Sequence, residues 1–311
     1  MLENFKLYIN RQASSFWRYI LVFIIIFTAT NTIGALPLIS VIIIKSISNP
    51  EILDTTTDNL MDLSTYGIDP NTGLLLMIFP FIIGLLALFL LMKPFHKRKF
   101  ITVFNGAGKI RWKKFFIAAL VWLILMGLYL YFSMYNDPGN FTINNLSKSL
   151  IWLVLIAVLF IPFQTTFEEV LFRGYLMQGA GAWFKNKWLP LIITSLLFGL
   201  MHSFNPEIKE FGFWVMIPQY VLFGLVFGLL TIFDNGIEIA MGAHAANNVF
   251  LSVFVTQESS ALQTPAIYEQ QQVNPWADFL SLLIISIIFI VLMGIFNRWR
   301  LKDIFKLKYN L

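Results

Sequence analysis

Long uninterrupted runs of apolar residues are the feature that most restricts how this chain can fold. Of its 311 residues, 58% are hydrophobic and only 13% are charged, and each run approaches the roughly 20 residues that a helix needs to cross a bilayer. Backbone polar groups in lipid must be hydrogen-bonded within the protein, which favours helices. We therefore predict an all-α fold, a polytopic bundle of about eight transmembrane helices. The expected spans cover residues 19–44, 74–92, 115–135, 149–167, 189–203, 213–231, 237–256 and 277–296.

The distribution of basic residues predicts how the bundle is oriented. Of the 22 Lys and Arg residues, 19 flank span ends that share one side of the membrane, and only Lys45, Lys148 and Lys209 flank the other. Such a bias places both termini in the cytoplasm. The net charge of +5 comes from residues beside the apolar runs, so no nucleic-acid partner is expected. The bilayer itself is the predicted surrounding, in a multi-pass protein of the cell membrane. The Phe, Ile and Asn content favours a bacterial plasma membrane.

The chain contains no cysteine. A thiol nucleophile, structural disulfides and thiolate metal sites are therefore excluded.

Two adjacent carboxylates lie at the end of the fourth apolar run. Glu168 and Glu169 follow it directly, and Arg173 lies one helical turn after Glu169, so Glu169 and Arg173 are expected to form an ion pair. Glu168 points about 100° away around the helix, and desolvation would raise its proton affinity and make it a usable base. We expect a bend at Pro162, with a second helical piece over 166–179. A solvated pair at the end of a helix is the simpler alternative.

Two of the three histidines also lie inside apolar runs. His202 follows Phe198 by one turn, and His244 precedes Asn248 by one turn in a segment of small residues. Polar residues at membrane depth are costly and commonly functional. Each one alone also fits an interfacial side chain or a helix-packing seam, but three helices carrying such groups favour a shared water-filled cavity.

These motifs resemble a known family. Glu168-Glu169-x-x-x-Arg173, Phe198-x-x-x-His202 and His244-x-x-x-Asn248 occur in order on successive helices. Together they resemble the CAAX-protease and bacteriocin-processing family of intramembrane glutamic endopeptidases, also called abortive-infection proteins. The resemblance covers residues 150–255. It implies three regions: 1–148 with three spans, a catalytic core over 149–256, and 257–311 with an extracytoplasmic loop, the last span and a basic cytoplasmic tail.

The resemblance also implies a role for each residue. Glu168 would activate water as general base, and His202 would help to orient that water. His244 and Asn248 would donate hydrogen bonds to the oxyanion. Glu169 and Arg173 would support the site as a structural pair, and Phe198 would wall the pocket. The expected partner is a membrane-associated peptide or protein substrate, and no cofactor is expected.

Other readings remain open. Glu168, His202 and His244 could bind zinc together with a water, although Asn248 would then lack a role and no His-Glu-x-x-His helix is present. A non-catalytic bacteriocin-immunity or membrane scaffold factor would keep the cavity for peptide binding alone. A transporter would use intramembrane acids as a proton relay, but the chain shows no inverted repeat.

Overall fold

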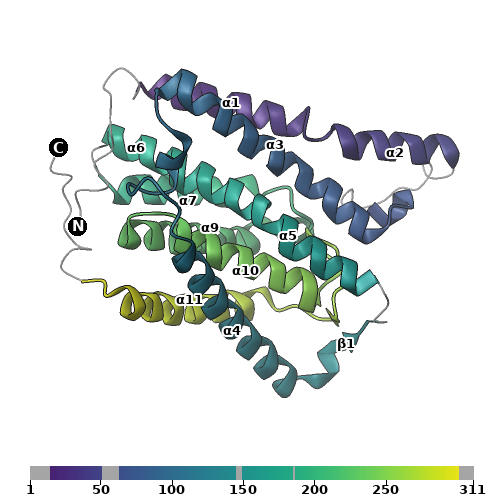
Figure 1. Cartoon of the computed structure of the whole chain (residues 1–311). Helices are drawn as coiled ribbons and strands as arrows, with labels where there is room; N and C mark the ends of the chain where they lie inside the picture. The colour runs from purple at the N-terminus through teal and green to yellow at the C-terminus, as the bar shows by residue number, and fades with distance from the viewer. Residues whose placement is uncertain (1–14, 51–62, 145–148, 185, 301–311) are drawn as a thin grey trace.

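The chain folds into a bundle of helices with one very small sheet. The structure is a computed structural model, and it describes residues 15–50, 63–144, 149–184 and 186–300. Most of the predicted basic tail and the basic residues before residue 15 lie outside the described residues. Figure 1 shows the helices lying side by side, with α4 crossing in front of α10. The α-helices are α1 Phe16–Asn31, α2 Leu36–Ser48, α3 Pro70–His96, α4 Trp112–Asn136, α5 Ser149–Glu169, α6 Met177–Phe184, α7 Trp188–Met201, α8 Pro206–Phe211, α9 Phe213–Asp234, α10 Glu238–Phe254 and α11 Pro275–Asn297.

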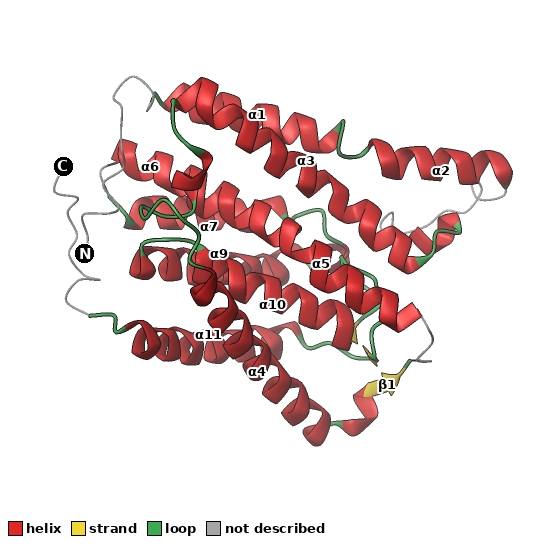
Figure 2. Cartoon of the chain, in the orientation of Figure 1, coloured by secondary structure: helices red, strands yellow, loops and turns green. Residues whose placement is uncertain are grey.

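The remaining elements are short. The strands β1 Phe141–Ile143, β2 Val255–Thr256 and β3 Tyr268–Gln270 form a sheet in the order β1-β3-β2, antiparallel between β1 and β3 and parallel between β2 and β3. Figure 2 shows strands in yellow on the right of the view, below the end of α5. Single 3₁₀ turns cover Leu63–Tyr66, Phe100–Val103 and Pro138–Asn140. The sheet is too small to alter the predicted class: this is an all-α polytopic membrane protein.

Six stretches of helix within the described residues are long and apolar enough to cross a membrane. They are Phe16–Ser48, Pro70–His96, Trp112–Asn136, Ser149–Phe184, Phe213–Asp234 and Pro275–Asn297. Each contains one of the eight expected spans. The other two expected spans, 189–203 and 237–256, coincide with α7 of 14 residues and α10 of 17 residues. These two segments carry polar side chains of the site described below, His202 directly after α7 and His244 within α10.

Local sequence explains where several helices begin and break. Asp69 accepts a hydrogen bond from the Thr72 amide at 3.0 Å and precedes Pro70, which suits the first helical position of α3. The first expected span is interrupted, because residues 32–35 separate α1 from α2. At Gly34 an added Cβ would lie 2.6 Å from the Cα of Pro80, so this turn presses closely against α3.

Helix α10 is the centre of the bundle. Almost all of its first ten residues are buried, and it packs against α4, α5 and α9. A Cβ at Gly242 would lie 2.2 Å from the carbonyl oxygen of Phe115, so the α4 backbone leaves no room for a side chain there. Small residues at such positions let membrane helices approach closely. This close packing places His244, two residues later, deep in the protein.

The prediction of a second helical piece that begins at residue 166 is wrong. Helix α5 runs through Pro162 to Glu169, and the Thr165 hydroxyl donates to the Ile161 carbonyl at 3.3 Å instead of capping a new helix. The geometry changes after the glutamates, where Val170–Leu176 forms a π-helix that continues into α6. Short π segments are rare in proteins overall, and many of those that occur lie at functional sites.

Candidate active site

The two adjacent carboxylates lie in the protein interior. Glu168 is 6% exposed and Glu169 is fully buried. They end α5 in the middle of a continuous helical stretch of 36 residues, Ser149–Phe184. The simpler interpretation, a solvated pair at the end of a helix, is therefore contradicted. Buried carboxylates require hydrogen-bonding or charged partners, and the two find different ones.

Glu169 forms the expected ion pair with Arg173. Arg173 Nη1 lies 2.9 Å from Glu169 Oε1, and the arginine is 1% exposed. Its Nη2 donates to the α9 carbonyl oxygens of Gly224 at 3.3 Å and Phe223 at 3.5 Å. The guanidinium carbon lies 4.4 Å from the centre of the Phe198 ring, within the range of a cation–π interaction. The arginine thus joins the π-helix to both α7 and α9.

His244 connects the two carboxylates. Its Nδ1 lies 2.8 Å from Glu169 Oε1, and its Nε2 lies 3.8 Å from Glu168 Oε2. An ionised carboxylate only accepts hydrogen bonds, so Nδ1 carries a proton and donates a hydrogen bond to Glu169. Consequently Nε2 is directed at Glu168. The ring of Phe227 stacks on the imidazole at 5.0 Å and fixes its plane.

His202 is held at the C-terminal end of α7. Its Nδ1 lies 2.7 Å from the carbonyl oxygen of Phe198. A carbonyl only accepts, so Nδ1 donates, and Nε2 of the neutral imidazole carries a lone pair. Glu168 and His244 both interact electrostatically with this ring. His202 therefore presents a hydrogen-bond acceptor in the neighbourhood of the unpaired carboxylate.

Phe198 lies at the centre of this group. Its ring centre is 4.6 Å from that of His202, 6.1 Å from that of His244 and 5.2 Å from that of Phe172. It is 2% exposed. Phe198 thus lies next to both imidazoles and to the buried guanidinium, on one side of the cluster.

Asn248 is the predicted site residue with the weakest connection to the others. It is half-buried, and its Oδ1 accepts a hydrogen bond from Asn247 Nδ2 at 3.1 Å. Asn247 in turn accepts from the indole of Trp122 at 3.2 Å. The amide nitrogen of Asn248 shares the helix face of His244, one turn further along α10. Among the described residues, no hydrogen bond joins Asn248 to Glu168.

Two residues next to the cluster are not among those predicted from the sequence. Gln164, one turn before Glu168, places its Nε2 3.4 Å from Glu168 Oε1. The spacing of four residues is the signal that could have identified it. Tyr220 of α9 stacks on His202 with ring centres 4.3 Å apart and planes 20° apart. No spacing in the sequence indicates this second contact.

The residues suggested as zinc ligands do not form a metal-binding group. Among the described residues, no three His, Asp or Glu side chains converge as ligands would. We therefore derive no step of the reaction through a metal ion.

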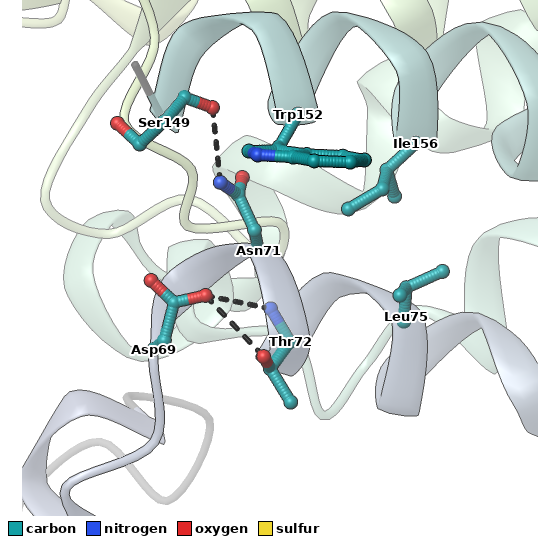
Figure 3. Close-up of a pocket in the computed structure, with 7 residues that line it drawn as sticks. All are labelled: Asp69, Asn71, Thr72, Leu75, Ser149, Trp152 and Ile156. Carbon is teal, nitrogen blue, oxygen red and sulfur yellow. Dashed lines mark hydrogen bonds between the residues drawn. The ribbon is translucent and has the colours of Figure 1, made fainter. Parts of the chain in front are cut away.

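A cavity of about 410 Å³ lies at the other end of α5. Figure 3 shows its lining from the beginnings of α3 and α5, where Asn71 donates to the Ser149 carbonyl at 3.0 Å. Ser149 and Glu168 are 19 residues apart on one helix, roughly 28 Å at 1.5 Å per residue. The cavity is therefore separate from the carboxylate cluster.

Comparisons with known proteins match the region of the cluster. Residues 147–250 match the family described as Rce1-like, type II CAAX prenyl endopeptidase Rce1-like. This range contains all seven residues singled out from the motifs, and the resemblance seen in the sequence is confirmed. A protein of Bacillus subtilis (strain 168), named "Uncharacterized protein YyaK", is 29% identical over 274 residues, which cover 87% of this chain and 89% of that protein. No solved structure matches the chain.

Proposed function

Because residues 147–250 belong to the Rce1-like family of type II CAAX prenyl endopeptidases, we propose that this protein is an intramembrane endopeptidase of the glutamic type. One observation carries the proposal. Glu168 is buried, and among the described residues no lysine or arginine forms an ion pair with it, whereas its neighbour Glu169 holds Arg173. Glu168 Oε2 accepts no hydrogen bond from the described residues, so it is available to accept one from water and then its proton, as the activation of water requires.

The proposed reaction begins with water between Glu168 and His202. The Glu168 carboxylate takes a proton from this water, while Nε2 of His202 accepts a hydrogen bond from the remaining O–H. The water oxygen attacks the scissile carbonyl carbon and forms a tetrahedral oxyanion. As the C–N bond breaks, Glu168 returns the proton to the leaving nitrogen. Each step uses a single carboxylate as base and then as acid.

His244 and Asn248 are the proposed donors to the oxyanion. Since Nδ1 of His244 already donates to Glu169, its Nε2 becomes a donor only in the imidazolium form. This assignment gives Glu169 a part in orienting His244, beyond the structural pairing with Arg173. Donors aimed at developing charge supply about 3–4 kcal/mol each.

The proposed substrate is a membrane-associated peptide or protein. The site lies within apolar helical stretches, so a substrate segment reaches it from the bilayer or from a membrane-embedded chain. We further propose eight spans with both termini in the cytoplasm, α7 and α10 being the two short ones. The related protein of Bacillus subtilis supports a bacterial plasma membrane.

The function is tested by comparing membrane peptides from cells that carry the wild type or Glu168→Gln. Peptides that appear only with the wild type identify the substrate and its cleavage site. If both cell lines contain the same peptides and the variant keeps the wild-type phenotype, the proposal fails. A binding-only immunity or scaffold factor would give that second result.

Asn248→Ala tests the oxyanion assignment. We expect cleavage to fall about 100-fold, the effect of losing one donor to the oxyanion, with little change in folding because Asn248 is half-buried. The measurement is kcat of the purified protein on the identified substrate. Wild-type turnover in this variant would remove Asn248 from the site.

Treatment with a chelator tests the zinc alternative. We expect EDTA and phenanthroline to leave the rate of cleavage unchanged, since the described histidines and carboxylates do not converge as a ligand set. Loss of activity that zinc restores would overturn the glutamic mechanism.

A further inference from the structure

The ring of Tyr220 is the unexplained neighbour of the site. It stacks on His202 nearly face to face, at 4.3 Å and 20°. His202 follows the last residue of α7, so the backbone beyond it is no longer helical and fixes the side chain less firmly. The hydrogen bond to the Phe198 carbonyl restrains one edge of the imidazole. Tyr220 covers one face.

The contact depends on a close approach of α7 and α9. A Cβ at Gly199 would lie 2.6 Å from Cγ2 of Val221, and a Cβ at Gly224 would lie 2.7 Å from the Cα of Ser195. Neither helix has room for a side chain at these crossing points. Both close contacts precede His202 along α7 and follow Tyr220 along α9, within about two turns of the stacked rings, so the packing that they permit sets the distance between the rings.

Polar groups hold the far end of Tyr220. Asn205 Nδ2 donates to its hydroxyl oxygen at 3.0 Å, and the hydroxyl also interacts with the carboxyl of Glu207. Glu207 is 8% exposed, and its Oε1 accepts a hydrogen bond from the Ala261 amide at 2.8 Å. Burial raises the pKa of the Glu207 carboxyl, and the hydrogen bonds from Ala261 and Tyr220 act in the opposite direction. The tyrosine is thus anchored at its hydroxyl and free to present its ring.

We propose that Tyr220 is a positioning residue for His202: its ring, held against the imidazole by the close approach of α7 and α9, keeps Nε2 of His202 directed at the water next to Glu168. This inference rests on the proposed function and adds to it a residue that the three sequence motifs do not contain. It also connects the site to the loop that carries Ala261, through Glu207. The expected signature is a loss in kcat that depends on the aromatic ring and not on the hydroxyl.

The kinetic test compares Tyr220→Leu with Tyr220→Phe on the identified substrate. Loss of a stacked ring corresponds to a fall in kcat of about 3- to 10-fold in Tyr220→Leu, with KM changed by less than about twofold. Tyr220→Phe keeps the ring and restores kcat to near the wild-type value. Phe254→Leu is the matched control, because it removes one ring from a stacked pair with Phe250 outside the cluster. We expect wild-type kinetics in that control.

A second test uses NMR spectroscopy and needs no substrate. The chain has three histidines, His96, His202 and His244, so selective histidine labelling gives three sets of NMR signals, assigned with single histidine variants. The His202 signals should move downfield in Tyr220→Leu, where the shielding ring is gone, and stay in place in Tyr220→Phe. Unmoved His96 signals report that the fold is kept. If Tyr220→Leu does not fold, Tyr220→Met replaces it.

The kinetic and NMR measurements distinguish failure of the proposed function from failure of the inference about Tyr220. If the wild type cleaves nothing, the proposed function fails, and the NMR signals still decide whether Tyr220 orients His202. Wild-type kcat together with unshifted His202 signals in Tyr220→Leu would overturn the inference. Equal losses in Tyr220→Phe and Tyr220→Leu would also overturn it, because the hydroxyl and not the ring would then be the acting group.

Discussion

Glu168→Gln is expected to lower cleavage by about 10²- to 10⁴-fold, the contribution of a general base, while the protein still folds and binds its substrate. Glutamine has the shape of glutamate and cannot take a proton from water. It removes a negative charge that has no arginine or lysine partner among the described residues, so no cation is left uncompensated. The measurement is single-turnover cleavage by protein reconstituted in lipid vesicles, with binding of the uncleaved substrate followed in parallel.

The control for this variant makes the same chemical change elsewhere. Glu258 is exposed in the loop after α10, and Glu258→Gln should keep wild-type turnover and binding. If Glu168→Gln cleaves at the wild-type rate, the carboxylate is not the base and the mechanism is wrong. If it loses binding as well as cleavage, Glu168 contacts the substrate directly and the proposed division of roles is wrong.

The sequence predicts the parts of the site that depend on local spacing. Glu169 and Arg173 are four residues apart, and the expected ion pair is present because a single turn of helix brings such residues together. The same spacing places Phe198 beside His202. Apolar runs predict the helices and the membrane class for a similar reason, since length and composition decide whether a helix can span lipid.

Contacts between distant segments are beyond this kind of reasoning. Glu169 and His244 are 75 residues apart, and only the packing of α10 against α5 brings them to 2.8 Å. The roles implied by the resemblance therefore describe Glu169 as a partner of Arg173 and leave out its bond to His244. The Tyr220 stack on His202 is hidden for the same reason, because it depends on glycines that set the distance between α7 and α9.

The helix geometry around the glutamates also cannot be predicted from the local sequence. Pro162 favours a bend, yet α5 passes through it and the irregular π-helix follows Glu169. A proline lacks one amide donor, and a helix tolerates this loss where neighbouring helices support it. The π-helix keeps Arg173 within reach of both Glu169 and the α9 carbonyls. Its cause is therefore tertiary packing, and the local sequence carries no signal for it.

Arg173→Met is expected to cause the largest loss of stability, about 3–5 kcal/mol, because it leaves a buried carboxylate uncompensated. Methionine replaces the apolar stem of the arginine side chain and removes the guanidinium that lies over Phe198. It removes the bond to Glu169 and the hydrogen bonds to the carbonyls of Phe223 and Gly224. Thermal unfolding of the purified protein in detergent measures the effect, and cleavage is assayed on the fraction that remains folded.

A second substitution distinguishes the charge from the lost contacts. In Glu169→Gln/Arg173→Met the buried negative charge is gone, so part of the lost stability should return, as it does when both members of a buried pair are replaced. Arg300→Met, at an exposed position near the end of α11, should unfold like the wild type. If Arg173→Met is as stable as the wild type and yet inactive, Arg173 acts in the reaction and its assignment as a supporting residue is wrong. If the double variant is no more stable than Arg173→Met, the hydrogen bonds to α9, and not compensation of the Glu169 charge, account for the stabilisation.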